Sequence, residues 1–387
     1  MIFIILDYAP HDLELLNLIF IIKVSHSKIK LKYKICMSFN EKTLYDFENV
    51  TKFRKEVINP IFPNADFKSS FMVSSPDEPA TSFKGELSTN NLFKETDYEY
   101  KGDGRFLHYT SLFGIKAILE TGFLRMSEFG NLIDKKELQY GARVFEDNSI
   151  FQFDKDELEK LKNNLFCLSA CESNEFTKRD GFMWEVYADK GKGVLLEFEL
   201  TKKNPKKFLL GKVQYGDNSL QPLKIIKAHA EQFVKDNEGF FPNNFLQLFM
   251  EIQSFHKAER YKVEQEVRLF LKVEKEAHEN HTLESIYKDI NSNQEVKYFN
   301  QLYLKGRHPY LNFKYPFSDE EDEVFNEFPQ IEIKNIILGY NISVENKVDL
   351  AYFLCNLKKE HKYDFKISQI CDEGIIKEMY PPCNLPD

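Results

Sequence analysis

One short segment brings an imidazole, a phenol and a hydroxyl together. Residues 106–111 read Phe-Leu-His-Tyr-Thr-Ser, which predicts a strand that ends in His108, Tyr109 and Thr110. An amphipathic helix closed by Gly122 should follow, and then a second strand. Such a corner exposes the three side chains at the end of a sheet, where they could hold a polar ligand. A buried His and Tyr in a packed corner is the alternative, and these residues alone do not decide between the two.

Two carboxylates form a second candidate site. A strand is expected over residues 263–273. Positions two apart on a strand share a face, so Glu264, Glu266 and Arg268 should point the same way. The carboxylates repel unless a cation or ligand hydroxyls lie between them, and Arg268 can partly supply that cation. A solvated face on an edge strand is the alternative. Three apolar neighbours instead favour a strand packed inside a sheet, with the carboxylates in a cleft. These neighbours are Val267, Leu269 and Phe270.

A short helix expected over residues 182–188 carries two aromatic rings. Trp184 and Tyr187 are three positions apart, so they lie on adjacent turns of one helix face. They could stack on a planar heterocycle, or they could simply pack the helix against the sheet. Residues 191–193, Gly-Lys-Gly, resemble a fragment of a phosphate loop. They lack its spacing and its Ser or Thr, so we interpret them as a tight turn.

The remaining reactive side chains do not form a recognisable site. His278 and His281 lack the HExxH spacing and lie in a polar stretch, so they are expected at the surface without a metal. No serine lies in a GxSxG elbow. The six cysteines are scattered without a CxxC pair, which argues against a disulfide scaffold and a structural zinc site.

Composition indicates a globular protein of the cytoplasm. The charged fraction is 29%, and the apolar runs near the start are too short to cross a bilayer, so no membrane partner is expected. The formal net charge of -9 argues against a nucleic-acid coat. A local basic cleft could still bind phosphate, because such binding depends on local charge.

The expected strands and helices mix without regular βαβ alternation, which predicts an α+β fold. Further strands are expected at 165–170, 193–200 and 331–339. The polar stretch 69–96 is interpreted as a linker or surface loop. The predicted regions are an N-terminal extension with linker (1–97), a main domain with a helical insertion near 221–260 (98–345), and a C-terminal helix and tail (346–387).

Six motifs follow one another in a fixed order: HYTS with its helix and glycine, CLSAC, MW..YA, GVLLEFE, E.E.R and IILG. This order resembles the bacterial domain-of-unknown-function 2971 family over residues 100–345. It is more remotely similar to the ADP-ribosyltransferase superfamily, in its poly(ADP-ribose) polymerase-like and DNA-modifying toxin branches. In these branches a strand that ends in His precedes a helix with Ile-Leu, and a glycine follows. The matching residues here are His108, Ile118-Leu119 and Gly122. A later strand carries the catalytic Glu, which Glu266 matches.

The resemblance implies a split mixed or antiparallel sheet of ADP-ribosyltransferase-like type with flanking helices, and NAD as the substrate. Breaking the nicotinamide–ribose bond builds positive charge on the ribose. Glu266, bonded to the ribose 2′-hydroxyl, would stabilise that charge, and Glu264 would activate or orient the acceptor. A Gln at position 266 is then expected to leave folding almost unchanged.

The same resemblance implies which residues bind NAD. His108 would donate to the adenosine ribose with support from Thr110, and Tyr187 or Tyr109 would stack on nicotinamide. His108, Tyr187 and Glu266 should therefore line one cleft. The superfamily's tyrosine on the strand at 165–170 is absent here. The other implied NAD-binding residues are Phe166, which could stack in place of that tyrosine, Ser169, Trp184 and Arg268.

Two functions of different classes remain open. The first is transfer of ADP-ribose from NAD to an unknown acceptor (nucleic acid or protein) or hydrolysis of NAD, which the resemblance associates with toxins and antiphage effectors. The second is a non-catalytic nucleotide-sensing or protein-interaction module on the same fold. The missing strand tyrosine favours the second function, whereas the Glu-Gln-Glu segment favours catalysis.

Overall fold

The structure is a computed structural model, and the chain divides into two compact units. The described residues are 2–6, 19–24, 27–32, 41–73, 82–88, 91–121, 123–128, 137–145, 165–202, 208–237, 240, 245–272, 286–288, 295–297, 310–313, 330–361, 365–371 and 376–379. Unit 1 comprises residues 1–99, 138–154 and 217–256, and unit 2 comprises residues 100–137, 155–216 and 257–387. We describe each unit by itself.

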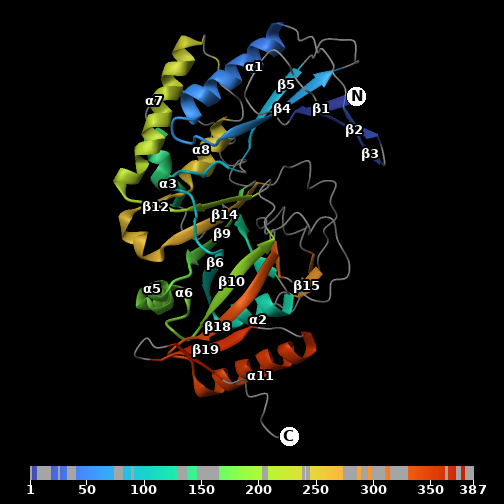
Figure 1. The fold of residues 1–387 in the computed structure, drawn as a ribbon. Coiled ribbons are helices and arrows are strands. Elements are labelled where there is room, and N and C mark those ends of the chain that lie inside the picture. The colour runs from blue at the N-terminus through green and yellow to red at the C-terminus, as the bar shows by residue number, and fades with distance from the viewer. Residues whose placement is uncertain are drawn as a thin grey trace. The chain divides into compact units, whose positions relative to one another are not determined.

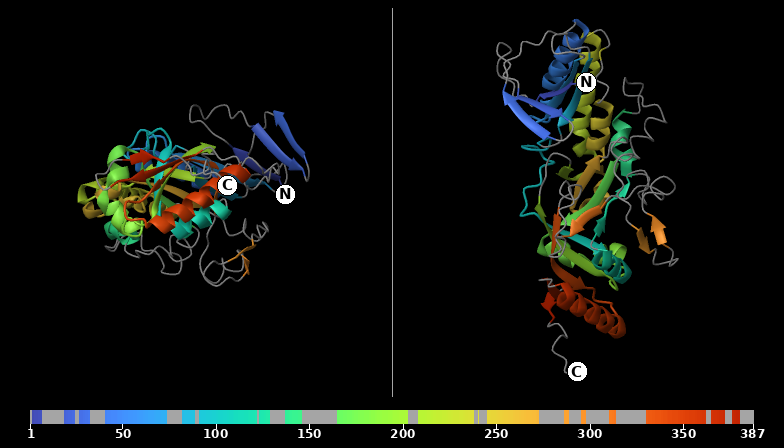
Figure 2. Two further views of the ribbon diagram at one scale, coloured as in Figure 1. Left: turned by 90° about the horizontal axis from the view of Figure 1, so that it is seen from below. Right: turned by 90° about the vertical axis from the view of Figure 1, so that its right-hand side faces the viewer.

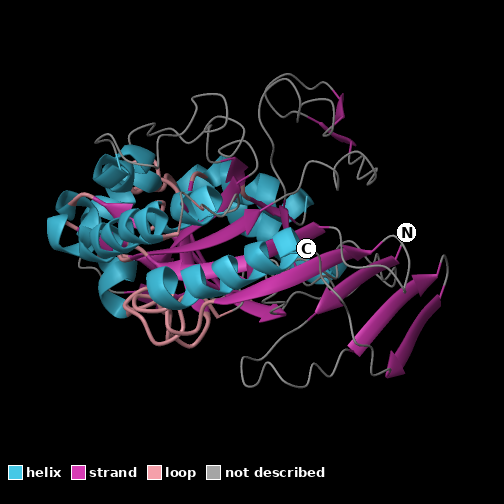
Figure 3. Ribbon diagram, turned by 90° about the horizontal axis from the view of Figure 1, so that it is seen from above, coloured by secondary structure: helices cyan, strands magenta, loops and turns pink. Residues whose placement is uncertain are grey.

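Unit 1 combines helices with small sheets. Figure 3 distinguishes the helices and strands of the described residues by colour. Its helical elements are α1 (Glu41–Phe53), the π-helical turn η1 (Arg54–Ile58), α3 (Glu137–Ala142), the 3-10 turns η3 (Arg143–Phe145) and η4 (Asp217–Leu220), α7 (Gln221–Asp236) and α8 (Phe245–Gln253). Its strands are β1 (Ile2–Leu6), β4 (Asp66–Val73) and β5 (Ser82–Ser88), which form one sheet, and β2 (Ile19–Val24) and β3 (Ser27–Lys32), which form another.

Strands β4 and β5 correct the sequence interpretation of residues 69–96 as a linker. The two strands pair antiparallel, with Asp66 opposite Ser88 and Met72 opposite Ser82. The polar composition of this stretch led to the wrong interpretation, because the hydrogen bonds between strands come from backbone groups. Every residue except proline supplies a backbone donor and a backbone acceptor, so a polar segment can also form a strand.

Helices α7 and α8 cover residues 221–236 and 245–253 of the stretch 221–260 that was expected to be helical, whereas residues 256–257 form strand β13 instead. In α7 the buried side chains Leu223, Ile226, Ala230 and Phe233 follow the three- and four-residue spacing of a helix face. Phe53 of α1 packs edge-on against Phe233, with ring centroids 5.1 Å apart. Residues 217–256 therefore group with the N-terminal residues in unit 1.

Unit 2 is built on a mixed sheet that has eleven strands among the described residues (Figures 1 and 2). The main path runs β11 (Phe208–Lys212), β14 (Glu266–Lys272), β9 (Leu165–Glu172), β6 (Arg105–Thr110), β10 (Val194–Lys202), β18 (Gln330–Leu338), β17 (Tyr310–Phe313) and β7 (Phe123–Arg125). Off this path lie β8 (Ser127–Glu128), β19 (Lys366–Ile370) and β20 (Ile376–Glu378). Strand β18 runs parallel to β17 and β19 and antiparallel to β10, which makes the sheet mixed.

Helices cover both faces of this sheet. Helices α2 (Leu112–Thr121) and α11 (Val344–His361) pack against one face, where Phe106, Leu196 and Ile336 are buried. Helix α6 (Gly181–Tyr187), which follows α5 (Glu175–Arg179), packs against the other face. The remaining short elements are β12 (Gln214–Tyr215), β13 (His256–Lys257), η5 (Glu259–Glu264), β15 (Ile286–Lys288) and β16 (Glu295–Lys297). The predicted α+β class, with a large mixed sheet and flanking helices, is confirmed.

The ladder between β6 and β9 is short. Strand β6 pairs with β10 along its whole length, and β14 pairs with β9 along its whole length. By contrast, β6 pairs with β9 only at Phe106, opposite Glu172, and at Leu107, opposite Cys171. The ladder therefore ends immediately before His108, in the middle of the sheet.

No helix of the described residues has both the length and the apolar character that a bilayer crossing requires. Among the cysteines, Cys355 takes part in a disulfide, and Cys167, Cys171 and Cys371 are free thiols.

Candidate functional site

The two candidate carboxylates come from different elements. Glu264 is the last residue of the 3-10 helix η5, and Glu266 is the first residue of β14. Gln265 between them has a φ of 41°, which turns the chain from helix into strand. The expectation that Glu264, Glu266 and Arg268 alternate along one strand is therefore wrong for Glu264. The strand begins at Glu266, three residues later than the expected start at residue 263.

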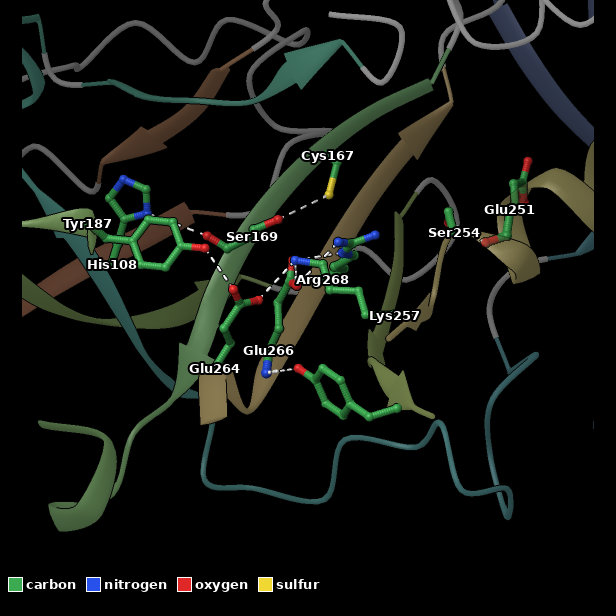
Figure 4. A network of polar contacts seen from close by, with 11 residues as sticks. His108, Cys167, Ser169, Tyr187, Glu251, Ser254, Lys257, Glu264, Glu266 and Arg268 are labelled. Carbon is green, nitrogen blue, oxygen red and sulfur yellow. Dashed lines mark hydrogen bonds and ion pairs between the residues drawn. The ribbon is translucent and has the colours of Figure 1, made fainter. Parts of the chain in front are cut away.

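A buried lysine joins the two carboxylates (Figure 4). Lys257 Nζ lies 2.9 Å from Glu264 Oε2 and 2.7 Å from Glu266 Oε2. Arg268 Nε donates to Glu266 Oε1 at 2.7 Å, and Arg268 Nη2 donates to Glu266 Oε2 at 3.2 Å. All four residues are buried, with Arg268 at 0% relative exposure. We call Lys257, Glu264, Glu266 and Arg268 the ion cluster.

The charges of the ion cluster balance, and the balance keeps Glu266 ionised. Burial alone would raise the pKa of the Glu266 carboxyl. The nearby Arg268 guanidinium and Lys257 ammonium outweigh burial and lower that pKa to about 2. The cluster thus holds a carboxylate charge inside the protein, where a charge without partners would be strongly disfavoured.

Three neighbours surround the carboxylates. Tyr187 of α6 donates its hydroxyl to Glu264 Oε1 at 2.7 Å, and the residue as a whole is 43% exposed. Burial and the bond to Glu264 raise the pKa of Tyr187, so its phenol stays protonated. The hydroxyl of Tyr215 accepts the backbone N–H of Glu266 at 2.8 Å. Burial first, and then the charges of Glu266 and Glu264, raise the pKa of the Cys171 thiol on β9.

His108 is linked to the ion cluster through strand β9 and not by a direct contact. Its Nδ1 lies 3.4 Å from the carbonyl oxygen of Ser169, and burial lowers its pKa, so the ring is neutral at pH 7. Ser169 is in turn the ladder partner of Arg268. Figure 4 shows the imidazole directed at the Ser169 carbonyl.

The register separates His108 from Glu266 by face. Glu266 is opposite Cys171, which is opposite Leu107, so these three share one face of the sheet. His108 follows Leu107 and alternates to the other face, but it lies beyond the last β6–β9 pair. The expectation that His108, Tyr187 and Glu266 line one cleft is therefore wrong for His108. Tyr187 and Glu266 join through Glu264 and Lys257, whereas His108 belongs to the opposite face of the sheet.

Tyr109 and Trp184 occupy the core. Tyr109 donates its hydroxyl to the carbonyl of Thr177, and Trp184 Nε1 donates to the carbonyl of Lys178 at 2.8 Å. Their rings meet edge-on, with centroids 5.3 Å apart, and Trp184 is fully buried. These contacts fix α5 and α6 against β6 and favour the packing interpretation of both residues over ligand stacking.

The other expected binding residues lie around the end of β6. Thr110 is partly buried, and its Oγ1 lies 2.1 Å from the point that a Cβ on Gly114 would occupy, so Thr110 packs on the first turn of α2. Ser169 is exposed, and its Oγ lies 3.7 Å from Cys167 Sγ. The backbone of Phe166 belongs to β9, but its side chain lies outside the described residues.

A glycine corner closes the end of β6. Asp189, Lys190 and Gly191 have φ values of 48°, 56° and 76°, which confirms the tight turn predicted there. A Cβ on Gly193 would lie 2.3 Å from the carbonyl oxygen of Thr110, and a Cβ on Gly339 would lie 2.1 Å from that of Gly191. The backbones therefore approach too closely for any side chain at either glycine.

Sequence reasoning missed Lys257 and Tyr215. Repulsion between Glu264 and Glu266 did signal that a further cation was required, but lysines are frequent in this region, and spacing did not distinguish Lys257 from Lys262. As to metals, the described residues contain no group of three His, Cys, Asp or Glu side chains that could hold an ion. His278 and His281 lie outside the described residues.

Comparison with known proteins gives one match. The model of a family described as a protein of unknown function (DUF2971) matches residues 183–269. This segment contains Trp184, Tyr187 and the whole ion cluster, and it covers part of the range 100–345 over which the motifs resemble that family. No curated protein and no solved structure matches the chain. The likeness to ADP-ribosyltransferases therefore rests on the motifs.

Proposed function

We propose that unit 2 transfers ADP-ribose from NAD to an acceptor, or hydrolyses NAD, with Glu266 as the carboxylate that stabilises the reacting ribose. One observation carries the proposal: Glu266 is held ionised by Lys257 and Arg268 at the start of β14, two strands from His108. Leaving-group departure from NAD creates positive charge on the ribose, and a fixed carboxylate stabilises that charge without rearrangement.

The contacts of buried Glu266 with Arg268 and Lys257 account for three acceptor positions of its carboxylate. A carboxylate has about four acceptor positions. Arg268 Nε occupies one on Oε1, while Arg268 Nη2 and Lys257 Nζ both contact Oε2. A ribose 2′-hydroxyl could therefore donate to Oε1 without displacing either cation.

Glu264 and Tyr187 are suited to the acceptor. The phenol of Tyr187 donates to Glu264, and the ring is partly exposed. Glu264 could accept a proton from an acceptor hydroxyl, amine or water. Protein, nucleic acid or water could fill this role, and a toxin or antiphage effector is the biological setting that the motif resemblance supplies.

The proposal requires that one NAD molecule contact both His108 and Glu266. His108 and Glu266 belong to opposite faces in the register, so a ligand that touches both must reach from one face of the sheet to the other. A dinucleotide is long enough to do so. The split sheet implied by the motif resemblance is consistent with the short ladder between β6 and β9.

A non-catalytic nucleotide-sensing or protein-interaction module is the second candidate. Two observations favour it. The carboxylates already have partners within the protein, and β9 carries no tyrosine. A balanced buried ion cluster can also serve conformational specificity alone.

Release of nicotinamide separates the two candidates. The purified protein is incubated with labelled NAD, alone and then with nucleic acid or cell lysate. The enzyme should release nicotinamide, and Glu266→Gln and His108→Ala should each abolish the release. Glu199→Gln on β10, where the carboxylate pairs with Lys334, is the matched control and should retain it.

Binding and growth complete the test. NAD should raise the melting temperature under both candidates, because any ligand of the native state stabilises it. Expression of the wild type should slow growth, and expression of Glu266→Gln should not. A thermal shift without nicotinamide release under any acceptor, together with normal growth, would replace the enzyme with the sensing module.

A further inference from the structure

We propose that Lys257 is a positioning residue that keeps Glu264 and Glu266 ionised at the same time. Its catalytic consequence rests on the proposed function, whereas its electrostatic role does not. Among the described residues, Lys257 is the cation that contacts both carboxylates, at 2.9 Å and 2.7 Å. Arg268 contacts Glu266, and Glu264 otherwise bonds to the neutral phenol of Tyr187.

The polar groups around Lys257 come from five elements. Helix η5 supplies Glu264 and the ring of Tyr261, whose centroid is 5.5 Å from Lys257 Nζ. Strand β14 supplies Glu266 and Arg268. The remaining three groups are neutral at pH 7: Tyr187 of α6, Tyr215 of β12 and Cys171 of β9, each with its pKa raised by burial. Lys257 is therefore the cation that balances Glu264.

Removal of Lys257 leaves one negative charge in excess. Glu266 keeps its two-bond pairing with Arg268, so Glu264 is the carboxylate that loses its cation. Two like charges at a buried site cannot both persist, and one proton binds to the pair. We expect that proton on Glu264, and a protonated Glu264 can no longer accept a proton from an acceptor.

The first experiment measures thermal stability against pH in Lys257→Met. In this variant the folded protein should bind one proton more tightly than the unfolded chain does. The variant should therefore be more stable at acid pH and should lose stability as the pH rises toward 8. The melting-temperature deficit relative to wild type should be at least ~5 °C larger at pH 8 than at pH 5. Lys262→Met is the control, because Lys262 is exposed and pairs with Glu259; it should show no such difference.

A double variant provides a second readout. Lys257→Met/Glu264→Gln removes one cation and one anion, so it should be more stable at pH 8 than Lys257→Met alone. It also covers the case in which the single variant fails to fold. Equal pH dependence in Lys257→Met and wild type, together with a double variant no more stable than the single, would overturn the proposal.

The last experiment tests the catalytic consequence by measuring how the rate of nicotinamide release depends on pH. If wild type releases nicotinamide, the rate for Lys257→Met should fall at pH 7 and recover toward pH 9, as Glu264 loses its proton. The thermal shift with NAD should be retained. An unchanged profile would reject the positioning role. If wild type releases no nicotinamide, the proposed function fails, and the stability experiments still decide whether Lys257 keeps both carboxylates charged.

Discussion

Two consecutive residues, His256 and Lys257, show two ways of burying polar groups. His256 is fully buried in unit 1, where Nε2 lies 2.9 Å from the Tyr98 hydroxyl and Nδ1 lies 3.2 Å from Ser219 Oγ. Lys257 is buried in unit 2, between Glu264 and Glu266. The first is a chain in which an imidazole lies between two hydroxyls, which we call the histidine chain, and the second is a balance of full charges.

The difference determines what one substitution does. Loss of a partner in the histidine chain removes one hydrogen bond. Loss of a partner in the ion cluster leaves a buried charge without a counter-charge, and the resulting destabilisation is several times larger. A protein therefore has little reason to bury four charges for stability alone, because well-packed apolar residues would serve as well. This favours a functional role for the ion cluster.

The largest effect is expected for Glu266→Gln. The substitution leaves Lys257 and Arg268 with one positive charge in excess, so the free energy of unfolding should fall by roughly 3–5 kcal/mol. Under the proposed function, turnover should fall by roughly 10²-fold or more. This changes the expectation from sequence that folding is almost unaffected, because repulsion from Glu264 is already relieved by Lys257. Urea unfolding measures the first effect, and nicotinamide release measures the second.

Lowering the pH should remove the charge of Glu266 in the wild-type protein. The pKa of Glu266 is lowered from 4.5 to about 2, so its stabilisation is present above pH 4.5 and is lost as the pH falls toward 2. The loss amounts to at most about 3 kcal/mol, at about 1.4 kcal/mol per pKa unit. Urea unfolding between pH 5 and 2 measures it. Glu266→Gln should lack this part of the acid dependence, and an identical dependence in both proteins would contradict the assignment.

A smaller effect is expected in the histidine chain. Tyr98→Phe leaves His256 Nε2 without its phenol partner, and the free energy of unfolding should fall by about 1–2 kcal/mol. Urea unfolding again provides the measurement. A loss as large as that of Glu266→Gln would show that the two regions do not differ in the way proposed.

The smallest effect is expected for Tyr187→Phe. This change removes the hydroxyl that donates to Glu264 but keeps the ring, and the ring is already partly exposed. Stability should change by less than about 1 kcal/mol. Nicotinamide release should stay within roughly tenfold of wild type, because Lys257 still holds Glu264. A complete loss of release would instead assign Tyr187 to substrate binding.

The regular elements of unit 2 were predictable from sequence because local patterns specify them. Strands β6, β9, β10 and β18 and helices α2 and α6 lie where apolar runs, periodicity and glycines indicated. The partners of buried charges were not predictable, because Lys257 meets Glu266 only after η5 has turned the chain. The conformation of Gln265 was not predictable either. A positive φ at a residue other than glycine cannot be recognised from the amino-acid sequence, yet this φ determines which way Glu264 points.

Face assignment failed for a similar reason. Motif order placed His108 and Glu266 in one sheet, which the structure bears out, but the face of each depends on pairing register through β9. A shift of one residue moves a side chain to the other face. Tertiary packing specifies the pairing register between strands that are distant in sequence. The register therefore cannot be predicted from the sequence of each strand alone.

The glycine corner has a consequence for tracing the ancestry of this chain. Gly193 and Gly339 lie far apart in sequence, yet neither can accept a side chain while Thr110, Gly191 and Gly193 keep their backbone positions. Relatives that have exchanged the reactive residues for others could still preserve both glycines, since the corner is required for the fold whatever the chemistry. A search pattern that pairs these two glycines with the strands preceding Gly339 and following Gly193 should therefore detect divergent members that the His and Glu motifs overlook.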